Sequence, residues 1–202
     1  MNNNSIHLAI FASGSGTNAE NIIRYFQKHD YKFKIYCNNP HAGVLKRAQN
    51  LSVPFKIFNQ KDFYQTDSII QDLIEQKIDL IVLAGFLWLI PEIMVKKFEQ
   101  KIINIHPAIL PNYGGKGMYG MHVHQAVYQD FISGKINETG ITIHWVNEKY
   151  DEGKYILQVK CPLQKGDNPE TIAQKVHELE YKYYPLVIEN ILNNPTCYEK
   201  ND

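Results

Sequence analysis

The chain has 202 residues, of which 44% are hydrophobic and 21% charged, so it is long enough for one sizeable core and short for two full domains. Lysine plus arginine equals aspartate plus glutamate, at 21 each, and this balance argues against a general nucleic-acid binder. A small-molecule partner is therefore expected. The three cysteines form no Cys-x-x-Cys pair and suit a reducing compartment.

The beginning of the sequence indicates a cytoplasmic protein. Residues 1–5 are polar and uncharged, and the apolar run at residues 6–12 is too short for a secretory signal and lacks its basic flank. Residues 80–90 form the most apolar stretch, but Gly85 interrupts it, and it falls short of the roughly 20 residues that span a bilayer. We therefore expect a cytoplasmic location and no membrane partner.

Short apolar runs of strand length alternate with longer segments of helical period through the first half of the chain. The expected strands are residues 6–12, 33–36, 55–57, 80–84 and 102–105, and the expected helices are residues 18–28, 44–50, 67–76 and 91–98. This alternation predicts the α/β class, with a mostly parallel central sheet and helices on both faces. The strand at 80–84 is entirely apolar, as a central strand buried on both faces requires.

The alternation changes after Ile105. The expected elements are a loop rich in Gly, Pro and Tyr at 107–120, a helix at 122–132, and two strands at 141–146 and 155–159. These two strands are expected to pair as a hairpin that extends the sheet in antiparallel fashion. A last helix is expected to begin at Asn168 and Pro169, a cap followed by a first-turn proline. We expect a single domain over residues 1–192 and a C-terminal tail over residues 193–202.

A glycine-rich turn follows the first strand and opens the first helix. Glycines let the backbone approach an anion, and a helix start presents free N–H groups, so Gly16, Thr17 and Asn18 are candidates for a phosphate site. A dinucleotide site would need an acid about 20 residues further on, where the second strand instead ends in Cys-Asn-Asn. A single phosphate fits better. The alternative is an ordinary turn with a capping box formed by Thr17 and Glu20.

Two polar side chains lie at the end of the strand at 102–105. Asn104 and His106 are two residues apart, so in a strand they project from the same face. Pro107 favours an extended His106, and the carboxyl end of a parallel strand is where open α/β sheets bind ligands. An amide donor beside an imidazole suits an oxyanion formed at a carbonyl carbon. A hydrogen-bonded structural pair is the alternative.

A carboxylate, Asp151, lies in the turn between the two late strands, two residues before Gly153. An aspartate in such a place most often serves the turn itself. A carboxylate close to His106 would instead stabilise its imidazolium and carry protons. The sequence leaves both interpretations open, because it does not show whether the two residues meet.

Other polar residues give weaker signals. His122 and His124 lie two apart on one expected helix and project from different faces, without a cysteine or carboxylate cluster beside them, so no metal is expected. His144 lies in an alternating strand and is interpreted as a hydrogen-bonded structural histidine. Glu180 lies at the edge of the apolar stripe of the last helix, where it either has a structural partner or binds a polar ligand.

The order of these motifs resembles the folate-dependent formyltransferases over residues 6–192. The marks are Ser-Gly-Ser-Gly-Thr-Asn at 13–18, Val-Leu-Ala-Gly-Phe at 82–86, Asn-Ile-His-Pro at 104–107, Leu-Pro at 110–111, and Asp-Glu-Gly at 151–153 before Tyr-Ile-Leu-Gln at 155–158. Asn-x-His-Pro followed by Leu-Pro is specific to this superfamily, and the first-turn motif favours its members that formylate glycinamide ribonucleotide. The resemblance implies a Rossmann-like formyltransferase fold.

The resemblance also implies a role for each matching residue. Asn104, His106 and Asp151 would be catalytic, while Gly16, Thr17 and Asn18 would hold the phosphate of the ribonucleotide and Glu180 its ribose hydroxyls. The folate would be bound, largely through backbone groups, by Leu87, Trp88, Leu89, Ile90, Asn104, Asn147, Glu148, Lys149, Tyr150 and Asp151. The implied cosubstrate is 10-formyltetrahydrofolate, no metal is implied, and the chain is expected to be a monomer or a homodimer.

The implied reaction is direct transfer. The glycinamide amine attacks the formyl carbon, Asn104 and a protonated His106 hold the oxyanion, and Asp151 helps to carry protons. Some residues depart from the family pattern: the loop at 114–120 is longer than in many members, Trp88 stands where a basic residue is common, and Lys154 replaces a proline. The details of folate binding are the part of the resemblance that these departures affect.

Other functions remain as alternatives. Within the superfamily, an initiator methionyl-tRNA formyltransferase usually has a further C-terminal domain and a basic surface, and a formyltetrahydrofolate hydrolase usually has an N-terminal regulatory domain. A sugar-nucleotide formyltransferase needs a nucleotide pocket for which the sequence gives no signal. From a different class, a non-catalytic nucleotide-binding Rossmann-like module would explain the glycine-rich turn alone. A large distance between His106 and Asp151 would favour that last alternative.

Overall fold

In a computed structural model of the protein, the structure describes residues 5–194, and the chain divides into two compact units. The first unit ends at Ile103 and the second begins at Asn104. The strands of the first unit pair in parallel, and the second unit contains an antiparallel hairpin. The predicted α/β class, with a mostly parallel sheet and a late antiparallel extension, is confirmed.

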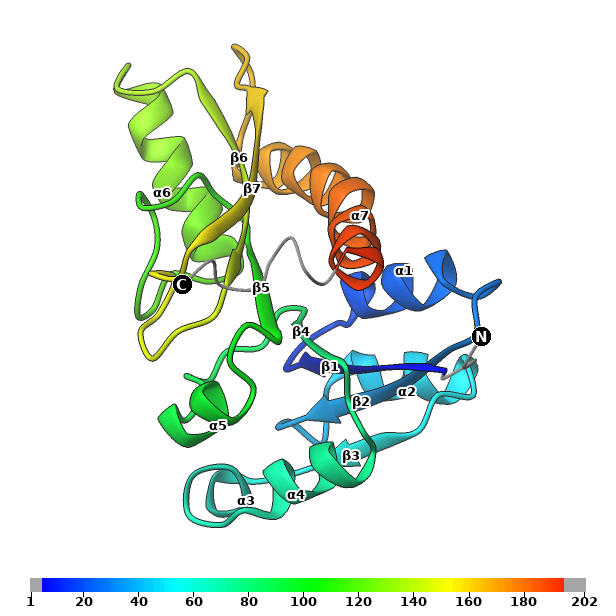
Figure 1. Ribbon diagram of the computed structural model, residues 1–202. Coiled ribbons are helices and arrows are strands. Elements are labelled where there is room, and N and C mark those ends of the chain that lie inside the picture. Colours follow the sequence, from blue (N-terminus) through cyan, green and yellow to red (C-terminus); the bar gives the residue numbers. More distant parts are fainter. Residues whose placement is uncertain (1–4, 195–202) are drawn as a thin grey trace. The chain divides into compact units, whose positions relative to one another are not determined.

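The first unit contains four parallel strands (Figure 1). They are β1 (Ile6–Ala12), β2 (Tyr31–Cys37), β3 (Phe55–Ile57) and β4 (Leu80–Leu83), and the helices are α1 (Thr17–Tyr25), α2 (Gly43–Asn50), α3 (Gln60–Tyr64), α4 (Ser68–Glu75) and α5 (Glu92–Lys97). Strand β1 pairs with β2 on one side and with β4 on the other. Every residue of β4 is buried, which explains why its sequence is apolar throughout rather than alternating.

The second unit is built around a hairpin and two helices (Figure 1). Strand β5 (Ile102–His106) leads into this unit, which then contains α6 (Met121–Ile132), β6 (Glu138–Trp145), β7 (Tyr155–Pro162) and α7 (Pro169–Asn193). Strands β6 and β7 are antiparallel, as predicted, and α7 packs against both strands and against α6. Helix α7 begins with a capping box between Asn168 and Thr171, followed by Pro169 in the first turn.

Two local features differ from the sequence interpretation. The capping box expected from Thr17 and Glu20 is wrong, because Gly16 precedes the helix in a left-handed conformation and no side chain caps the helix start. Glu20 instead forms ion pairs with Arg24 and Arg47. The short helix α3 was not expected, although Asn59 and Asp62 form a capping box at its start, since only one of its residues, Phe63, is buried.

Helix α7 extends to Asn193, and residues 195–202 of the expected tail lie outside the described residues. Among residues 5–194, no helix is both long enough and apolar enough to cross a membrane. The division into one domain over residues 1–192 and a tail stays a prediction.

Candidate active site

The second unit brings Asn104, His106 and Asp151 together. Asn104 and His106 project from one face of β5, and Asp151 comes from the turn between β6 and β7. The Nδ1 atom of His106 lies 3.5 Å from Oδ2 of Asp151, and Nδ2 of Asn104 donates to Oδ1 of Asp151 at 3.4 Å. The His106 and Asp151 side chains are 4% and 11% exposed, so this polar cluster is largely shielded from water.

The turn that carries Asp151 depends on a glycine. Asp151 itself has a φ of 56°, in the left-handed region that an aspartate tolerates better than most residues. Two residues later, a Cβ atom added to Gly153 would lie 1.6 Å from the carbonyl oxygen of Trp145. Only glycine therefore lets the chain pass this close to β6, and this passage is what directs Asp151 back towards His106.

His144 is a member of this cluster that the sequence interpretation did not place there. Its Nδ1 lies 2.8 Å from the carbonyl oxygen of Trp145, and its Nε2 lies 3.1 Å from Nδ2 of Asn104. The same Nε2 lies 3.6 Å from Asp151. His144 is hydrogen-bonded, as interpreted, and it also contacts the Asn104 amide and lies beside Asp151.

The environment keeps Asp151 ionised. Burial by itself would raise its pKa, but the hydrogen bond with His144, the charge of His106 and the N–H of Gly115 together lower the pKa below its usual range. The Gly115 N–H donates to Oδ2 at 2.9 Å. A buried carboxylate with these donors is a fixed negative charge beside the imidazole of His106.

Two opposing effects act on the pKa of His106. Burial lowers its pKa, while the Asp151 charge and a hydrogen bond to the Tyr113 carbonyl raise it, and burial dominates. Nε2 lies 2.8 Å from the Tyr113 oxygen, which can only accept, so this nitrogen carries a hydrogen. Nδ1, facing Asp151, is therefore the nitrogen that gains or loses a proton.

Thr142 holds the segment that follows His106 in place. Its hydroxyl donates to the carbonyl of Ala108 at 2.8 Å and accepts from the N–H of Leu110 at 3.0 Å, all three residues being buried. We expect Thr142→Val to lower the free energy of unfolding by about 1–3 kcal/mol, because both backbone groups lose their partner without gaining water. Urea unfolding measures this change.

Thr139 is the matched control for this prediction. It lies on the same strand and is 3% exposed, and its hydroxyl oxygen has no hydrogen-bond partner among the described residues. Thr139→Val removes a hydroxyl of the same kind without breaking a bond and should leave stability unchanged or raise it. Equal losses in the two variants would contradict the role given to Thr142.

In the first unit, the predicted phosphate-binding residues lie at the start of α1. Gly16 has a φ of 77°, and a Cβ atom there would lie 2.5 Å from the Val44 side chain, so both conformation and space require glycine. Thr17 and Asn18 occupy the first turn of the helix and are half-buried. The first turn of a helix presents backbone N–H groups without an intrahelical partner, and such groups suit an anion.

The segment predicted to contact folate lies in the loop after β4, beside the glycine-rich turn. The Leu87 N–H donates to the Ser13 hydroxyl at 3.1 Å, and the Ser13 N–H donates to the Gly85 carbonyl at 3.0 Å. Leu87 is 43% exposed, whereas Ile90 is buried. These bonds join the loops that follow β1 and β4.

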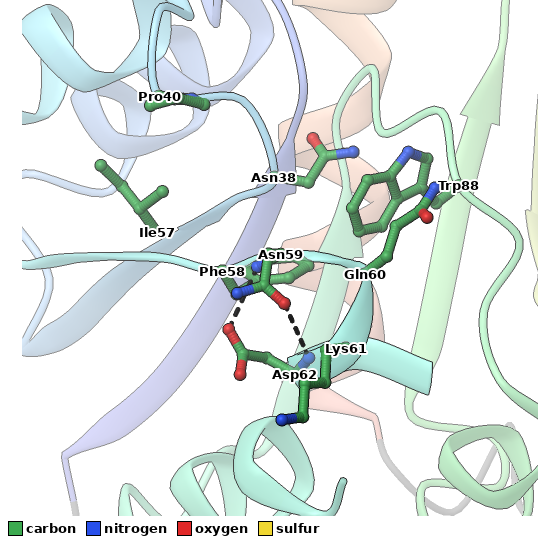
Figure 2. Close-up of a pocket in the computed structure, with 9 residues that line it drawn as sticks. All are labelled: Asn38, Pro40, Ile57, Phe58, Asn59, Gln60, Lys61, Asp62 and Trp88. Carbon is green, nitrogen blue, oxygen red and sulfur yellow. Dashed lines mark hydrogen bonds between the residues drawn. The ribbon is translucent and has the colours of Figure 1, made fainter. Parts of the chain in front are cut away.

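Trp88 from this loop lines a cavity of about 590 Å³ in the first unit. Figure 2 shows its indole ring facing the amide of Asn38, with Lys61 and the Asn59–Asp62 capping box at the start of α3 on another side. The oxygen of the Asn38 amide is buried and has no hydrogen-bond partner among the described residues. The cavity thus offers an aromatic wall, an amide group and a positive charge.

The other residues predicted for folate lie in the second unit, in the turn before Asp151. Asn147 accepts a hydrogen bond from the N–H of Lys149 at 3.0 Å, an Asx turn. Glu148 and Lys149 are exposed and Tyr150 is half-buried. Their part in ligand binding stays a prediction.

Glu180 is more deeply buried than its position at the edge of the stripe suggested. It is 4% exposed and accepts a hydrogen bond from Nδ1 of His177 at 2.8 Å. His124 of α6 is 2% exposed, and its ring centroid lies 6.1 Å from that of His177. Its Nδ1 has no hydrogen-bond partner in the described part of the chain, whereas His122 is exposed. The cluster places a buried carboxylate beside two imidazoles.

The His177–Glu180 pair makes stability depend on pH. The hydrogen bond to Glu180 raises the pKa of His177, against the effect of its partial burial. Because the folded pKa exceeds the unfolded value of about 6.5, the pair stabilises the fold below that pH and the effect is lost as pH rises through the folded pKa. His177→Gln should therefore cost more stability at about pH 6 than at about pH 9. Urea unfolding at both pH values measures it; an equal loss at both would contradict this explanation.

No group of three or more His, Cys, Asp or Glu side chains that could hold a metal occurs within residues 5–194. The absence of a metal from the function stays a prediction.

A strand-end amide and imidazole with an adjoining buried carboxylate suit acyl-group chemistry, and comparison with known families agrees with this class. Residues 6–188 match the formyl transferase family. The chain therefore belongs to the formyl transferase family.

Within this family, several of the similar proteins are named phosphoribosylglycinamide formyltransferase. The phosphoribosylglycinamide formyltransferase of Bacillus subtilis is 36% identical over 191 residues, which cover 91% of this chain and 93% of that protein. The protein of the same name from Haemophilus influenzae is 36% identical, covering 90% of this chain and 85% of its own length. The solved structure of glycinamide ribonucleotide transformylase 1 from Geobacillus kaustophilus matches with a TM-score of 0.81 and 33% identity, over 94% of this chain and 100% of that one.

Proposed function

We propose that this protein transfers the formyl group of 10-formyltetrahydrofolate to the amine of 5'-phosphoribosylglycinamide, a step of purine biosynthesis. The observation that carries the proposal is the buried cluster of Asn104, His106 and Asp151, in a chain whose similar proteins are named for this activity. Folate is a cosubstrate here, since it supplies the formyl group and leaves as tetrahydrofolate.

In the proposed reaction the amine nitrogen attacks the formyl carbon, the new C–N bond forms, and the formyl oxygen becomes negative. The Nδ2–H of Asn104 and a protonated Nδ1 of His106 stabilise this oxyanion. The Asn104–Asp151 contact of 3.4 Å is long for a hydrogen bond, so this amide hydrogen can turn to the oxyanion at little cost. Negative charge on the oxygen also opposes the burial effect that lowers the pKa of His106.

The collapse of this intermediate breaks the bond between the carbon and the folate nitrogen. One proton leaves the attacking amine and one arrives at the departing nitrogen, so the net transfer is a single proton. Asp151, held ionised, accepts the amine proton and returns it, directly or through water. The reaction needs neither a covalent enzyme intermediate nor a metal.

The binding roles rest on the family resemblance and on local chemistry. Gly16, Thr17 and Asn18 are proposed to bind the phosphate, because a glycine-started helix presents N–H groups to an anion. Glu180 is proposed to accept hydrogen bonds from the ribose hydroxyls, for which a buried, charged oxygen pair is suited. Gly16, Thr17 and Asn18 belong to the first unit of the chain, and Glu180 belongs to the second.

For the folate, we propose contacts with the loop containing Leu87, Trp88, Leu89 and Ile90 and with Asn147, Glu148, Lys149, Tyr150 and Asp151. The cavity lined by Trp88 suits a flat ring, and Lys61 suits the carboxylates of the glutamate end of a folate. We further propose a cytoplasmic location, small-molecule substrates only, and a monomeric or homodimeric state.

A single assay tests the substrates. Wild-type protein is mixed with 10-formyltetrahydrofolate and 5'-phosphoribosylglycinamide, and the loss of the formyl group from the folate is followed. We expect loss only when the ribonucleotide is present. Loss without the ribonucleotide would indicate a formyltetrahydrofolate hydrolase, and no loss at all would overturn the proposed substrates.

The non-catalytic nucleotide-binding module is the alternative from a different class. This alternative gives no reason for His106 and Asp151 to lie close together. Their side chains are 3.5 Å apart, and both are nearly buried. Burying two ionisable groups carries a desolvation cost, and buried groups of this kind cluster at functional sites. This geometry supports the catalytic alternative.

A further inference from the structure

The loop that follows Pro111 contacts both ionisable members of the proposed catalytic cluster through its backbone. The carbonyl of Tyr113 lies 2.8 Å from Nε2 of His106, and the N–H of Gly115 donates to Oδ2 of Asp151 at 2.9 Å. A Cβ atom added to Gly114 would lie 3.3 Å from the Cβ of Asp151, so the loop packs tightly against this side chain. The positions of His106 and Asp151 thus depend on the loop between residues 113 and 115.

The conformation of this loop is unusual at Tyr113. Its φ is 59°, in the left-handed region that a bulky residue rarely adopts unless its surroundings hold it there. The side chain provides such a hold, because its hydroxyl donates to Oδ2 of Asp130 on α6 at 2.8 Å. The other oxygen of Asp130 accepts from Lys135, which is 69% exposed.

The hydroxyl remains a donor at every pH at which the enzyme would work. Burial and the neighbouring carboxylate raise the pKa of Tyr113 to about 12. Lys135 and the Tyr113 hydroxyl lower the pKa of Asp130, which therefore stays ionised. A charged acceptor makes this bond stronger than one between neutral groups.

We propose that Tyr113 and Asp130 are positioning residues, whose hydrogen bond fixes the loop so that the Tyr113 carbonyl holds His106 in its reactive orientation and tautomer. This inference rests on the proposed catalytic role of His106. The bond acts through the backbone: it fixes the ring of Tyr113, the ring fixes the left-handed backbone, and the carbonyl fixes Nε2–H, which leaves Nδ1 as the nitrogen that exchanges a proton.

The first test is kinetic and uses Tyr113→Phe, Asp130→Asn and the double variant in the full chain. We expect each single variant to lower kcat on the order of tenfold, with KM changed by less than about twofold, because the alignment of the reacting groups is altered and the binding surfaces are not. The double variant should be no slower than the slower single variant, since one bond is lost in all three. Losses that multiply, or a kcat within about twofold of wild type, would overturn the proposal.

The second test does not depend on activity. In ligand-free protein with ¹⁵N-labelled histidine, the ring signals of His106 are assigned by their loss in His106→Gln and are then titrated. The ring also faces Asp151, His144, Glu180 and His124, and these remain in every variant tested. Because the Tyr113 carbonyl raises the pKa of His106, Tyr113→Phe should lower it and weaken the Nε2–H signal. An unchanged titration would overturn the inference even if the enzyme is active as proposed.

Two matched controls separate this effect from a general loss of packing. Lys135→Met removes the other partner of Asp130 and leaves the bond to Tyr113 intact. Tyr128→Phe removes a tyrosine hydroxyl from the same helix, α6. Both variants should retain the kcat of the wild type and its His106 titration, and a similar loss in either would contradict the assignment to the Tyr113–Asp130 bond.

Discussion

Asp151→Asn is expected to lower kcat by a factor of about 10²–10⁴ while the protein remains folded, because the change removes the group that carries the proton and stabilises the His106 imidazolium. The amide has nearly the same shape as the carboxylate, but it loses the negative charge that now lies 3.5 Å from His106. Steady-state kinetics with both substrates and a urea unfolding curve measure the two effects separately.

Glu152→Gln is the control for this variant. It makes the same change of charge at the next residue, on an exposed side chain that pairs with Lys149. Its kcat should stay close to that of the wild type. If Asp151→Asn retained more than about a tenth of the wild-type kcat, the carboxylate would not carry the proton as proposed.

Asn104→Asp should lower kcat by about 10²–10³, since it replaces a donor to the oxyanion by a negative charge. The new carboxylate would face Nε2 of His144 and the carboxylate of Asp151, which lie 3.1 Å and 3.4 Å from the present amide nitrogen. Repulsion between two acids at this distance raises the pKa of one of them, so the loss should be smaller at low pH, where one acid is protonated.

The comparison for this variant is Asn137→Asp, which adds the same charge at an exposed position in the second unit. We expect its kcat to equal that of the wild type at every pH. The test is to measure pH–rate profiles of the two variants and the wild type. If the loss of kcat in Asn104→Asp did not depend on pH, repulsion between residues 104 and 151 would be contradicted.

Much of the fold could be predicted because it depends on local periodicity. The expected strand at 6–12 and the expected strand at 55–57 match β1 and β3, and the antiparallel pairing of the late strands follows from their spacing. Alternation along β5 also placed Asn104 and His106 on one face. These features need information from only a few neighbouring residues.

The approach of Asp151 could not be predicted, because it depends on long-range pairing and on one turn. Between Ile143 and His144 the register of the hairpin shifts, and Gly153 passes close to the Trp145 carbonyl. A displacement of the hairpin by one residue would turn Asp151 away from β5. The register of the hairpin cannot be derived from the spacing of residues in the sequence.

His144 was missed for a related reason. All residues of β6 from Thr139 to Trp145 are buried, so both faces of the strand are covered and alternation no longer separates a core side chain from a site side chain. The signal that could have found it was the pairing of β6 beside β5, which brings His144 to Asn104.

The capping box predicted from Thr17 and Glu20 was wrong for a local reason. Gly16, in a left-handed conformation, is the residue that precedes α1, so Thr17 lies inside the helix and does not cap it.

The fate of the formyl carbon tests the central claim most directly. Wild-type protein is given 5'-phosphoribosylglycinamide and 10-formyltetrahydrofolate labelled with ¹³C in the formyl group, and the products are analysed by NMR. Our account predicts that the label appears on the glycinamide nitrogen, in an amount equal to the tetrahydrofolate released. Label found in free formate, or retained on the folate, would contradict it.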